Sequence, residues 1–198
     1  MLCFCENKMN LIEINKTLYY ACSNCGYLRK KHIPNQIEEK NRYDAHVCDE
    51  GYISYMNNVF LKLKPYLNNG KSLDYGCGQI HALSDIMNNN GYYCDYYDLY
   101  YYDNIIDKKY DNIILIEVFE HVENVYELLL KLKNMLNNNG QIIIMTKEKV
   151  VDLNNWWYLR DITHISFVEY KTMALLASML KLKLNYDKDN SLFIFSSI

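Results

Sequence analysis

The chain has 198 residues, half of them hydrophobic, which suits one globular domain with a small appendage. Its formal net charge of −3 at pH 7 argues against a general binder of nucleic-acid phosphates, which would carry a basic patch. No stretch approaches the roughly 20 consecutive apolar residues of a membrane-spanning helix, and the first residues lack a secretory-signal pattern, so we expect a cytoplasmic protein.

Four of the seven cysteines lie within the first 25 residues, as Cys3-x-Cys5 and Cys22-x-x-Cys25. They flank a short run rich in strand-forming residues, which is the outline of a two-stranded zinc ribbon over residues 1–31. Four thiolates from two short pairs can supply the tetrahedral ligand set that zinc prefers. Cys3, Cys5, Cys22 and Cys25 are therefore predicted to hold structural zinc. Free or partly oxidised cysteines are the alternative.

Residues 32–50 are polar and charged, without a hydrophobic period, and are interpreted as a connector. Apolar side chains at three-to-four spacing then indicate a helix over residues 51–67. Residues 51–198 are assigned to the main domain.

Strands and helices alternate through this domain, which predicts a parallel sheet with right-handed crossovers. Strands are expected at residues 72–75, 92–97, 111–117 and 141–146, with helices at 80–90 and 123–136. Ser166 to Glu169 matches a capping box, which predicts a helix from there to about Lys181. The last two apolar runs, 182–186 and 192–196, predict an antiparallel hairpin.

The most specific motif is Leu73-Asp74-Tyr75-Gly76-Cys77-Gly78, where a strand meets a glycine turn ahead of a helix. Glycines let the backbone approach a ligand, and a helix N-terminus offers amides to a carboxylate or phosphate. About twenty residues later the second strand ends at Asp98, which is placed to accept hydrogen bonds from ribose hydroxyls. These features predict a nucleotide-like ligand.

This motif resembles the first motif of the class I S-adenosylmethionine-dependent methyltransferases, Leu-Asp-x-Gly-Cys-Gly-x-Gly. The segments 110–122 and 136–140 are similar to the fourth strand of that family and the approach to its fifth, and the short third strand would fall near Asn104. Residues 42–46 and 155–167 resemble a subfamily with an N-terminal cysteine knuckle. The resemblance implies an α/β fold with a Rossmann-like, mostly parallel seven-stranded sheet, a C-terminal antiparallel hairpin and a small zinc-ribbon-like knuckle.

The resemblance also implies cofactor-binding roles. The turn would lie under the methionine part of S-adenosylmethionine, Asp74 would orient its amino group, Asp98 would bind the ribose and Leu99 would pack on adenine. Tyr43 and His46 are expected to close over the cofactor from the connector. The cofactor-binding residues expected are Tyr43, His46, Asp74, Tyr75, Gly76, Cys77, Gly78, Asp98, Leu99 and Glu117. The family's third glycine is Ile80 here, followed by His81, which puts close packing of the helix against the cofactor in doubt.

Candidates for the chemistry are Glu117, Glu120 and His121, at the strand end where parallel sheets bind ligands, together with the distant His164. Methyl transfer needs alignment and a nucleophile relieved of its proton. A divalent metal would relieve repulsion within this set. The set is similar to the small-RNA 2′-O-methyltransferases and the polyprenyl-quinol O-methyltransferases, which implies a metal that acidifies the acceptor hydroxyl. The alternatives are a metal-free histidine base, and a structural role in helix capping and the core.

Trp156 and Trp157 are adjacent, so one of them is expected to line a substrate pocket. The 20 tyrosines are interpreted as compositional drift on the surface. The expected reaction is O-methylation of a small or carrier-linked acceptor. One alternative is an RNA or protein acceptor docked by the knuckle, for which the short basic run 29–31 is the only support. Another is a non-enzymatic binding module of the same fold, motivated by Ile80.

Overall fold

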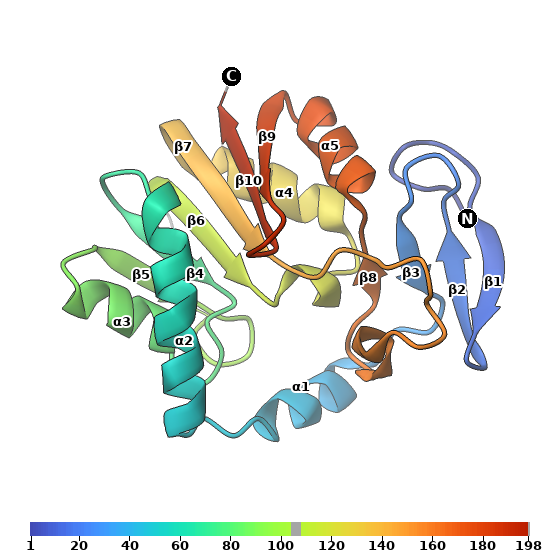
Figure 1. Ribbon diagram of the computed structural model, residues 1–198, viewed down its shortest axis with the longest axis horizontal. Helices are drawn as coiled ribbons and strands as arrows, with labels where there is room; N and C mark the ends of the chain where they lie inside the picture. Colours follow the sequence, from blue (N-terminus) through green and yellow to red (C-terminus); the bar gives the residue numbers. More distant parts are fainter. Residues whose placement is uncertain (104–107, 198) are drawn as a thin grey trace.

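The computed structural model of the protein describes residues 1–103 and 108–197, and these form two sheets (Figure 1). The central sheet has the strand order β5-β4-β6-β7-β10-β9. Its strands are β4 (Ser72–Tyr75), β5 (Cys94–Tyr97), β6 (Tyr110–Ile116), β7 (Leu136–Met145), β9 (Leu182–Asp187) and β10 (Leu192–Ser197). The first four in spatial order are parallel, and β10 is antiparallel to both β7 and β9. The expected α/β fold and the antiparallel C-terminal hairpin are confirmed.

The sheet is mixed and has six strands in the described residues, where seven mostly parallel strands were expected. The third strand predicted near Asn104 lies outside the described residues. None of the helices in residues 1–103 and 108–197 combines the length and the apolar character needed to cross a membrane.

Helices cover both faces of the central sheet (Figure 1). The helices are α1 (Gln36–Asp44), α2 (Glu50–Leu63), α3 (Ala82–Asn89), α4 (Val125–Asn134) and α5 (Tyr170–Met179), with short 3-10 turns η1 (Lys64–Tyr66), η2 (Phe119–His121) and η3 (Trp157–Arg160). Ile114 and Ile116 of β6 pack with α2 and α3, whereas Ile113 and Leu115 pack with α4 and α5. Alternate side chains point to opposite faces of a strand, so β6 is apolar on both.

The second sheet, of order β1-β2-β3-β8, joins the cysteine knuckle (residues 1–31) to a later part of the chain. Its strands are β1 (Asn10–Ile14), β2 (Thr17–Ala21), β3 (Leu28–Lys30) and β8 (Ser166–Phe167). The two-stranded ribbon of the prediction is thus three-stranded, and β8 adds a fourth, antiparallel strand through the pair Leu28 and Phe167.

The capping box predicted at Ser166 is wrong, because Ser166 lies in β8 and pairs with the free edge of β3. Helix α5 begins four residues later, where the Glu169 backbone N–H donates to Thr172 Oγ1 (3.0 Å). Pairing with a strand more than 130 residues away outweighed the local signal.

Helix α1 occupies most of the predicted connector. None of its residues is buried, so a hydrophobic period could not reveal it. A local signal exists nevertheless, since Asn35 Oδ1 accepts the N–H groups of Ile37 and Glu38 (3.0 Å each), and Glu38 completes a capping box.

Helix α3 begins at Ala82, two residues later than predicted. The preceding His81 has φ +36°, in the left-handed region that favours glycine, and its ring stacks on Tyr96 (centroids 4.1 Å apart). Ile80 and His81, where the chain departs from the family motif, therefore lie between the glycine turn and the first residue of the helix.

Candidate functional site

The chain bends sharply after β4 through two glycines in the left-handed region, Gly76 (φ +86°) and Gly78 (φ +71°). An added Cβ at Gly76 would lie 2.5 Å from Val118 Cγ2, so this position is closed by packing. At Gly78 no atom lies within 4 Å of an added Cβ. The bend therefore has bare backbone at the end of a parallel strand, with open space beside Gly78 where a ligand can approach.

Asp98, at the end of β5, lies directly beside this bend. Its Oδ2 accepts the Gly78 N–H (3.0 Å), and its Oδ1 accepts the Tyr100 N–H (2.8 Å). Oδ1 also accepts the Tyr101 N–H (3.3 Å), so Oδ2 is the oxygen that keeps a lone pair for a further donor. The following Leu99 is 61% exposed and free to contact a ligand.

Asp74 is the buried acid of the first motif, on β4 just ahead of the bend. Burial, with the Asp98 carboxylate nearby, raises its pKa to about 7. Its neighbour Tyr75 points to the opposite face, where its ring packs on Tyr97 and its hydroxyl accepts from Lys131 (3.2 Å). Because side chains alternate along a strand, Asp74 lies on the face of the sheet that α3 covers, and Tyr75 lies on the face that α4 covers.

Replacing Asp74 by asparagine is expected to stabilise the fold more at pH 8 than at pH 5. The folded-state pKa of about 7 exceeds the ordinary 3.8, so the folded protein holds this proton more tightly and wild-type stability falls as pH rises through this window. Asparagine cannot ionise, so the difference in unfolding free energy should grow by about 2–3 kcal/mol between the two pH values. Urea titrations measure it, with the exposed Asp189→Asn as control. A difference that does not change with pH would contradict this expectation.

A second group of side chains lies at the end of β6. The Tyr158 hydroxyl lies within hydrogen-bond distance of Glu117 Oε2 (2.8 Å) and Glu120 Oε1 (2.5 Å), with one proton to share between them, and Thr146 donates to Glu120 Oε2 (3.0 Å). Glu120 has no exposed surface, and burial together with the Glu117 carboxylate raises its pKa. Glu117 itself has φ +51°, which is strained for a residue with a side chain. Two acids are thus held together by one tyrosine hydroxyl.

His121 and His164 complete this acceptor-side cluster (Glu117, Glu120, His121 and His164). The Nε2 atom of each lies 4.0 Å from Glu120 Oε1, and their rings lie edge to face (4.8 Å). Burial, and the neighbouring His164, lower the pKa of His121 to about 3; burial also lowers the pKa of His164. Glu120, His121 and His164 each offer one ligand atom within 4.8 Å of the others, so these three could hold a metal ion.

Tyr43 and His46 lie where the two groups meet. The Tyr43 carbonyl accepts from Gln79 Nε2 (2.8 Å) next to the bend, and the Tyr43 ring is edge-on to His121 (5.4 Å). The His46 ring lies 6.3 Å from that of Tyr43. Helix α1 therefore covers the junction of the predicted cofactor and acceptor regions.

The two tryptophans have different surroundings, with Trp156 buried against Phe167 and Trp157 57% exposed, and the role of either in a substrate pocket stays a prediction. The interpretation of the tyrosines as surface drift is wrong for several of them. The buried tyrosines include Tyr19, Tyr27, Tyr110 and Tyr158.

Tyr158 and Tyr55 are functional candidates that sequence reasoning missed. Burial, followed by the charges of the Glu117 and Glu120 carboxylates, raises the pKa of Tyr55 of α2 to about 12. The only local feature of the sequence that could have indicated a functional role for Tyr158 is its place in the aromatic run 156–158.

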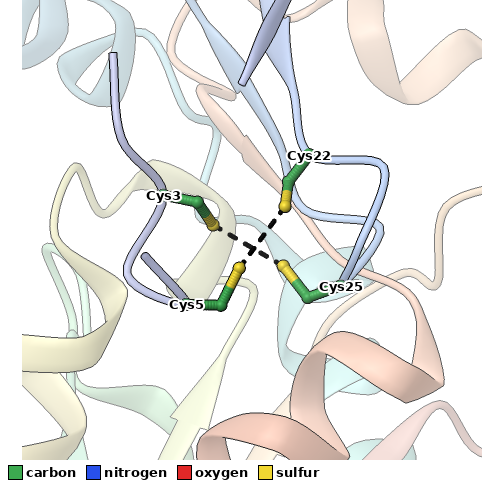
Figure 2. A group of neighbouring side chains, drawn as sticks. All are labelled: Cys3, Cys5, Cys22 and Cys25. Carbon is green, nitrogen blue, oxygen red and sulfur yellow. Dashed lines mark hydrogen bonds between the residues drawn. The ribbon is translucent and has the colours of Figure 1, made fainter. Parts of the chain in front are cut away.

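The four N-terminal cysteines converge from two loops (Figure 2). Cys3 Sγ lies 3.6 Å from Cys25 Sγ and Cys5 Sγ lies 3.5 Å from Cys22 Sγ, and all four sulfurs lie within 4.8 Å of one another. Tetrahedral zinc with bonds of about 2.3 Å requires sulfurs about 3.8 Å apart. These thiols are too far apart for disulfides, so the arrangement fits a zinc ion.

Comparisons with known proteins identify the central fold. A family model described as a methyltransferase domain matches residues 48–181. A SAM-dependent methyltransferase, possible histamine N-methyltransferase, from Thermotoga maritima is similar in structure, with TM-score 0.52, 10% identity, and coverage of 82% of this chain and 96% of that chain. An O-methyltransferase family protein from Burkholderia thailandensis is also similar in structure, with TM-score 0.54 and 9% identity. The match covers 80% of this chain and 61% of that chain. No curated protein matches the sequence. At these identities the structural likeness shows the fold alone.

Proposed function

Since the chain belongs to the methyltransferase domain family, we propose that it transfers the methyl group of S-adenosylmethionine to an oxygen of a small or carrier-linked acceptor. The observation that carries the proposal is the open glycine bend at the end of β4 with Asp98 beside it. The bend would bind the methionine part of the cofactor. The free lone pair of Asp98 Oδ2 would accept a hydrogen bond from a ribose hydroxyl, and the exposed Leu99 would cover the adenine.

Calorimetric titration of the purified chain with S-adenosylhomocysteine tests this proposal. We expect saturable binding of one molecule per chain, because the structure has one such bend among its described residues. No heat of binding for either S-adenosylhomocysteine or S-adenosylmethionine would favour the non-enzymatic binding module instead.

The acceptor-side cluster lies next to the proposed cofactor site, which supports a role in the transfer. Val118, one residue after Glu117, packs directly on Gly76 of the bend. An acceptor oxygen placed between Glu117 and the cofactor would need only alignment and removal of its proton. Neutral imidazole at His121 or His164 can take that proton.

We further propose that a divalent cation binds Glu120, His121 and His164. His121 Nδ1 lies 3.1 Å from the Thr163 carbonyl and His164 Nδ1 lies 2.8 Å from that of Tyr158. A carbonyl only accepts, so each Nδ1 carries the proton and each Nε2 directs a lone pair toward Glu120 Oε1. Backbone hydrogen bonds at Nδ1 are typical of metal-binding histidines. A cation between the three atoms would remove their repulsion and lower the pKa of an acceptor hydroxyl.

Removing one ligand should therefore weaken metal binding while leaving the cofactor site intact. His164→Ala is expected to weaken Mn²⁺ binding, measured by calorimetry and electron paramagnetic resonance, by at least about tenfold. Affinity for S-adenosylhomocysteine should remain within about twofold, because the contacts of His164 described above are with Tyr158, Glu120 and His121 and not with the glycine bend. The exposed His32→Ala controls for adventitious binding. Equal Mn²⁺ affinity in His164→Ala and the wild type would leave a metal-free histidine base as the better account.

A small acceptor is favoured over RNA, because Arg42 near the acceptor-side cluster and two of the three residues of the basic run 29–31 are already engaged. Arg42 pairs with Asp161 (2.6 Å), and Arg29 pairs with Glu123 (2.7 Å). Lys30 is buried, with its ammonium on backbone carbonyls. The basic run 29–31 therefore presents only one of its three residues to solvent, which is too little charge for a phosphate backbone.

For the cysteine knuckle we propose a structural zinc ion held by Cys3, Cys5, Cys22 and Cys25. Asn7 Nδ2 and Asn24 Nδ2 donate to Cys5 Sγ (3.5 and 3.7 Å). Such N–H donors stabilise a thiolate and orient it toward a metal.

A further inference from the structure

The cysteine knuckle shares a hydrophobic core with the segment of residues 153–167, which carries part of the acceptor-side cluster. The sheet β1-β2-β3 continues into β8 at the end of this segment (Figure 1). The buried members of this core are Ile14, Tyr19 and Leu28 from the knuckle, and Trp156, Tyr158, Leu159 and Phe167 from the segment. The knuckle is thus packed into the domain and does not project from it as a separate module.

Phe167 is the centre of this core. Tyr19 of the knuckle lies edge-on to it (centroids 6.1 Å), and Trp156 and Tyr158 pack on it from the segment (5.6 and 6.4 Å). The side chain of Tyr19 is 2% exposed, so its ring fills space that no solvent reaches. Loss of this ring would leave a cavity beside the rings of the segment.

The other side of Tyr158 forms the acceptor-side cluster. Its hydroxyl lies within hydrogen-bond distance of both Glu117 and Glu120, and its carbonyl accepts from His164 Nδ1. One residue therefore contacts three of the four members of the cluster while its ring packs in the knuckle's core. Shortening a side chain that packs on the Tyr158 ring would therefore disturb all three of these contacts at once.

Backbone and lysine contacts make a second connection between the same two regions. The Lys30 backbone N–H donates to the Ile165 carbonyl (2.8 Å), and the Ile165 N–H donates to the Glu120 carbonyl (2.8 Å). Lys30 Nζ donates to the carbonyls of Asp161 and Ile162 (3.2 and 3.1 Å). Strand β3 thereby fixes both the segment and the turn that holds Glu120.

We propose that the knuckle is the positioning element of the acceptor site: when its four cysteines hold zinc, its core fixes Tyr158, and Tyr158 in turn fixes Glu117, Glu120 and His164. The proposal rests on the proposed function for the meaning of that cluster. It assigns the knuckle an internal role in place of docking an RNA or protein. Because coupling between two sites is reciprocal, order in the segment should also raise the affinity of the knuckle for zinc.

The two tryptophans provide a natural reporter, because both lie in the segment. In a Trp157→Phe background, Trp156 alone reports on the shared core. Zinc removal by chelation is expected to shift its emission to longer wavelength. It should also speed hydrogen exchange of the peptide containing residues 158–165 by at least about tenfold. S-adenosylhomocysteine affinity should stay within about threefold, since the neighbours of the bend described above, Val118 and Asp98, lie outside the knuckle. Unchanged emission and exchange after complete loss of zinc would overturn the proposal.

Tyr19→Leu tests the same coupling without touching the cysteines. It should retain zinc but show the faster exchange and the red-shifted emission, because leucine leaves part of the space around Phe167 empty. Tyr19→Phe is the matched control and should behave as wild type, since it keeps the ring. Wild-type exchange in a zinc-loaded Tyr19→Leu variant would contradict the proposal. Failure of the wild type to bind S-adenosylhomocysteine would contradict only the proposed function, because exchange and emission need no cofactor.

Discussion

Gly78→Ala is expected to weaken S-adenosylhomocysteine binding by at least about tenfold while leaving the protein folded. An added Cβ at Gly78 meets no protein atom within 4 Å and projects into the open space beside the bend. In our proposal that space belongs to the cofactor, so the methyl group would collide with the ligand and not with the protein. Calorimetric titration measures the change in affinity.

The control for this experiment is Gly91→Ala. Gly91 has φ +83°, close to the +71° of Gly78, and an added Cβ there also meets no atom within 4 Å. Both alanines therefore carry the same backbone strain, about 1–2 kcal/mol of stability. Only the variant in the bend should lose affinity. Equal affinities of the two variants would show that the bend is not the cofactor site.

Cys22→Ser is expected to reduce bound zinc from about one ion per chain to below about 0.1, because serine cannot supply a thiolate to the tetrahedral site. The thermal midpoint should fall by at least about 10 °C, because zinc binding contributes directly to the folding of such small units. Cys22 also lies in the core that joins the knuckle to α4 and α5, so its environment is shared with the main domain. Plasma mass spectrometry and calorimetry give the two measurements.

Cys48→Ser is the matched control, since Cys48 is half-buried and lies outside the cluster. It should keep the zinc content and the midpoint of the wild type within about 2 °C. If Cys22→Ser retained its metal, or if the wild type were purified without zinc and bound none on addition, the four thiols would be a reduced, metal-free cluster.

Together the proposals divide the molecule into two regions that meet at α1. The glycine bend and Asp98 would hold the cofactor, and the acceptor-side cluster, supported by the knuckle, would hold the acceptor. Tyr43 contacts both, through Gln79 on one side and His121 on the other.

The sequence by itself determined the features that depend on neighbouring residues. The glycine turn could be predicted because it depends only on the backbone freedom of Gly76 and Gly78. The position of Asp98 could be predicted because it directly follows a strand. Apolar runs buried on both faces identified β6 and β7, and turn residues between two short runs identified the β9–β10 hairpin. The spacing of the cysteine pairs likewise predicted that their sulfurs converge.

Only the tertiary structure decided how distant segments complete one another. Strand β8 formed where the local pattern indicated a helix cap, because the edge of β3 offered unpaired backbone groups. Tyr158 became the centre of the acceptor-side cluster because its ring could be buried against Phe167 while its hydroxyl reached two acids about 40 residues earlier in the chain. A tyrosine is apolar along its ring and polar at its tip, so its sequence position does not reveal whether it will lie at the surface or join a core to a site. That choice depends on packing between segments that the chain brings together only when it folds.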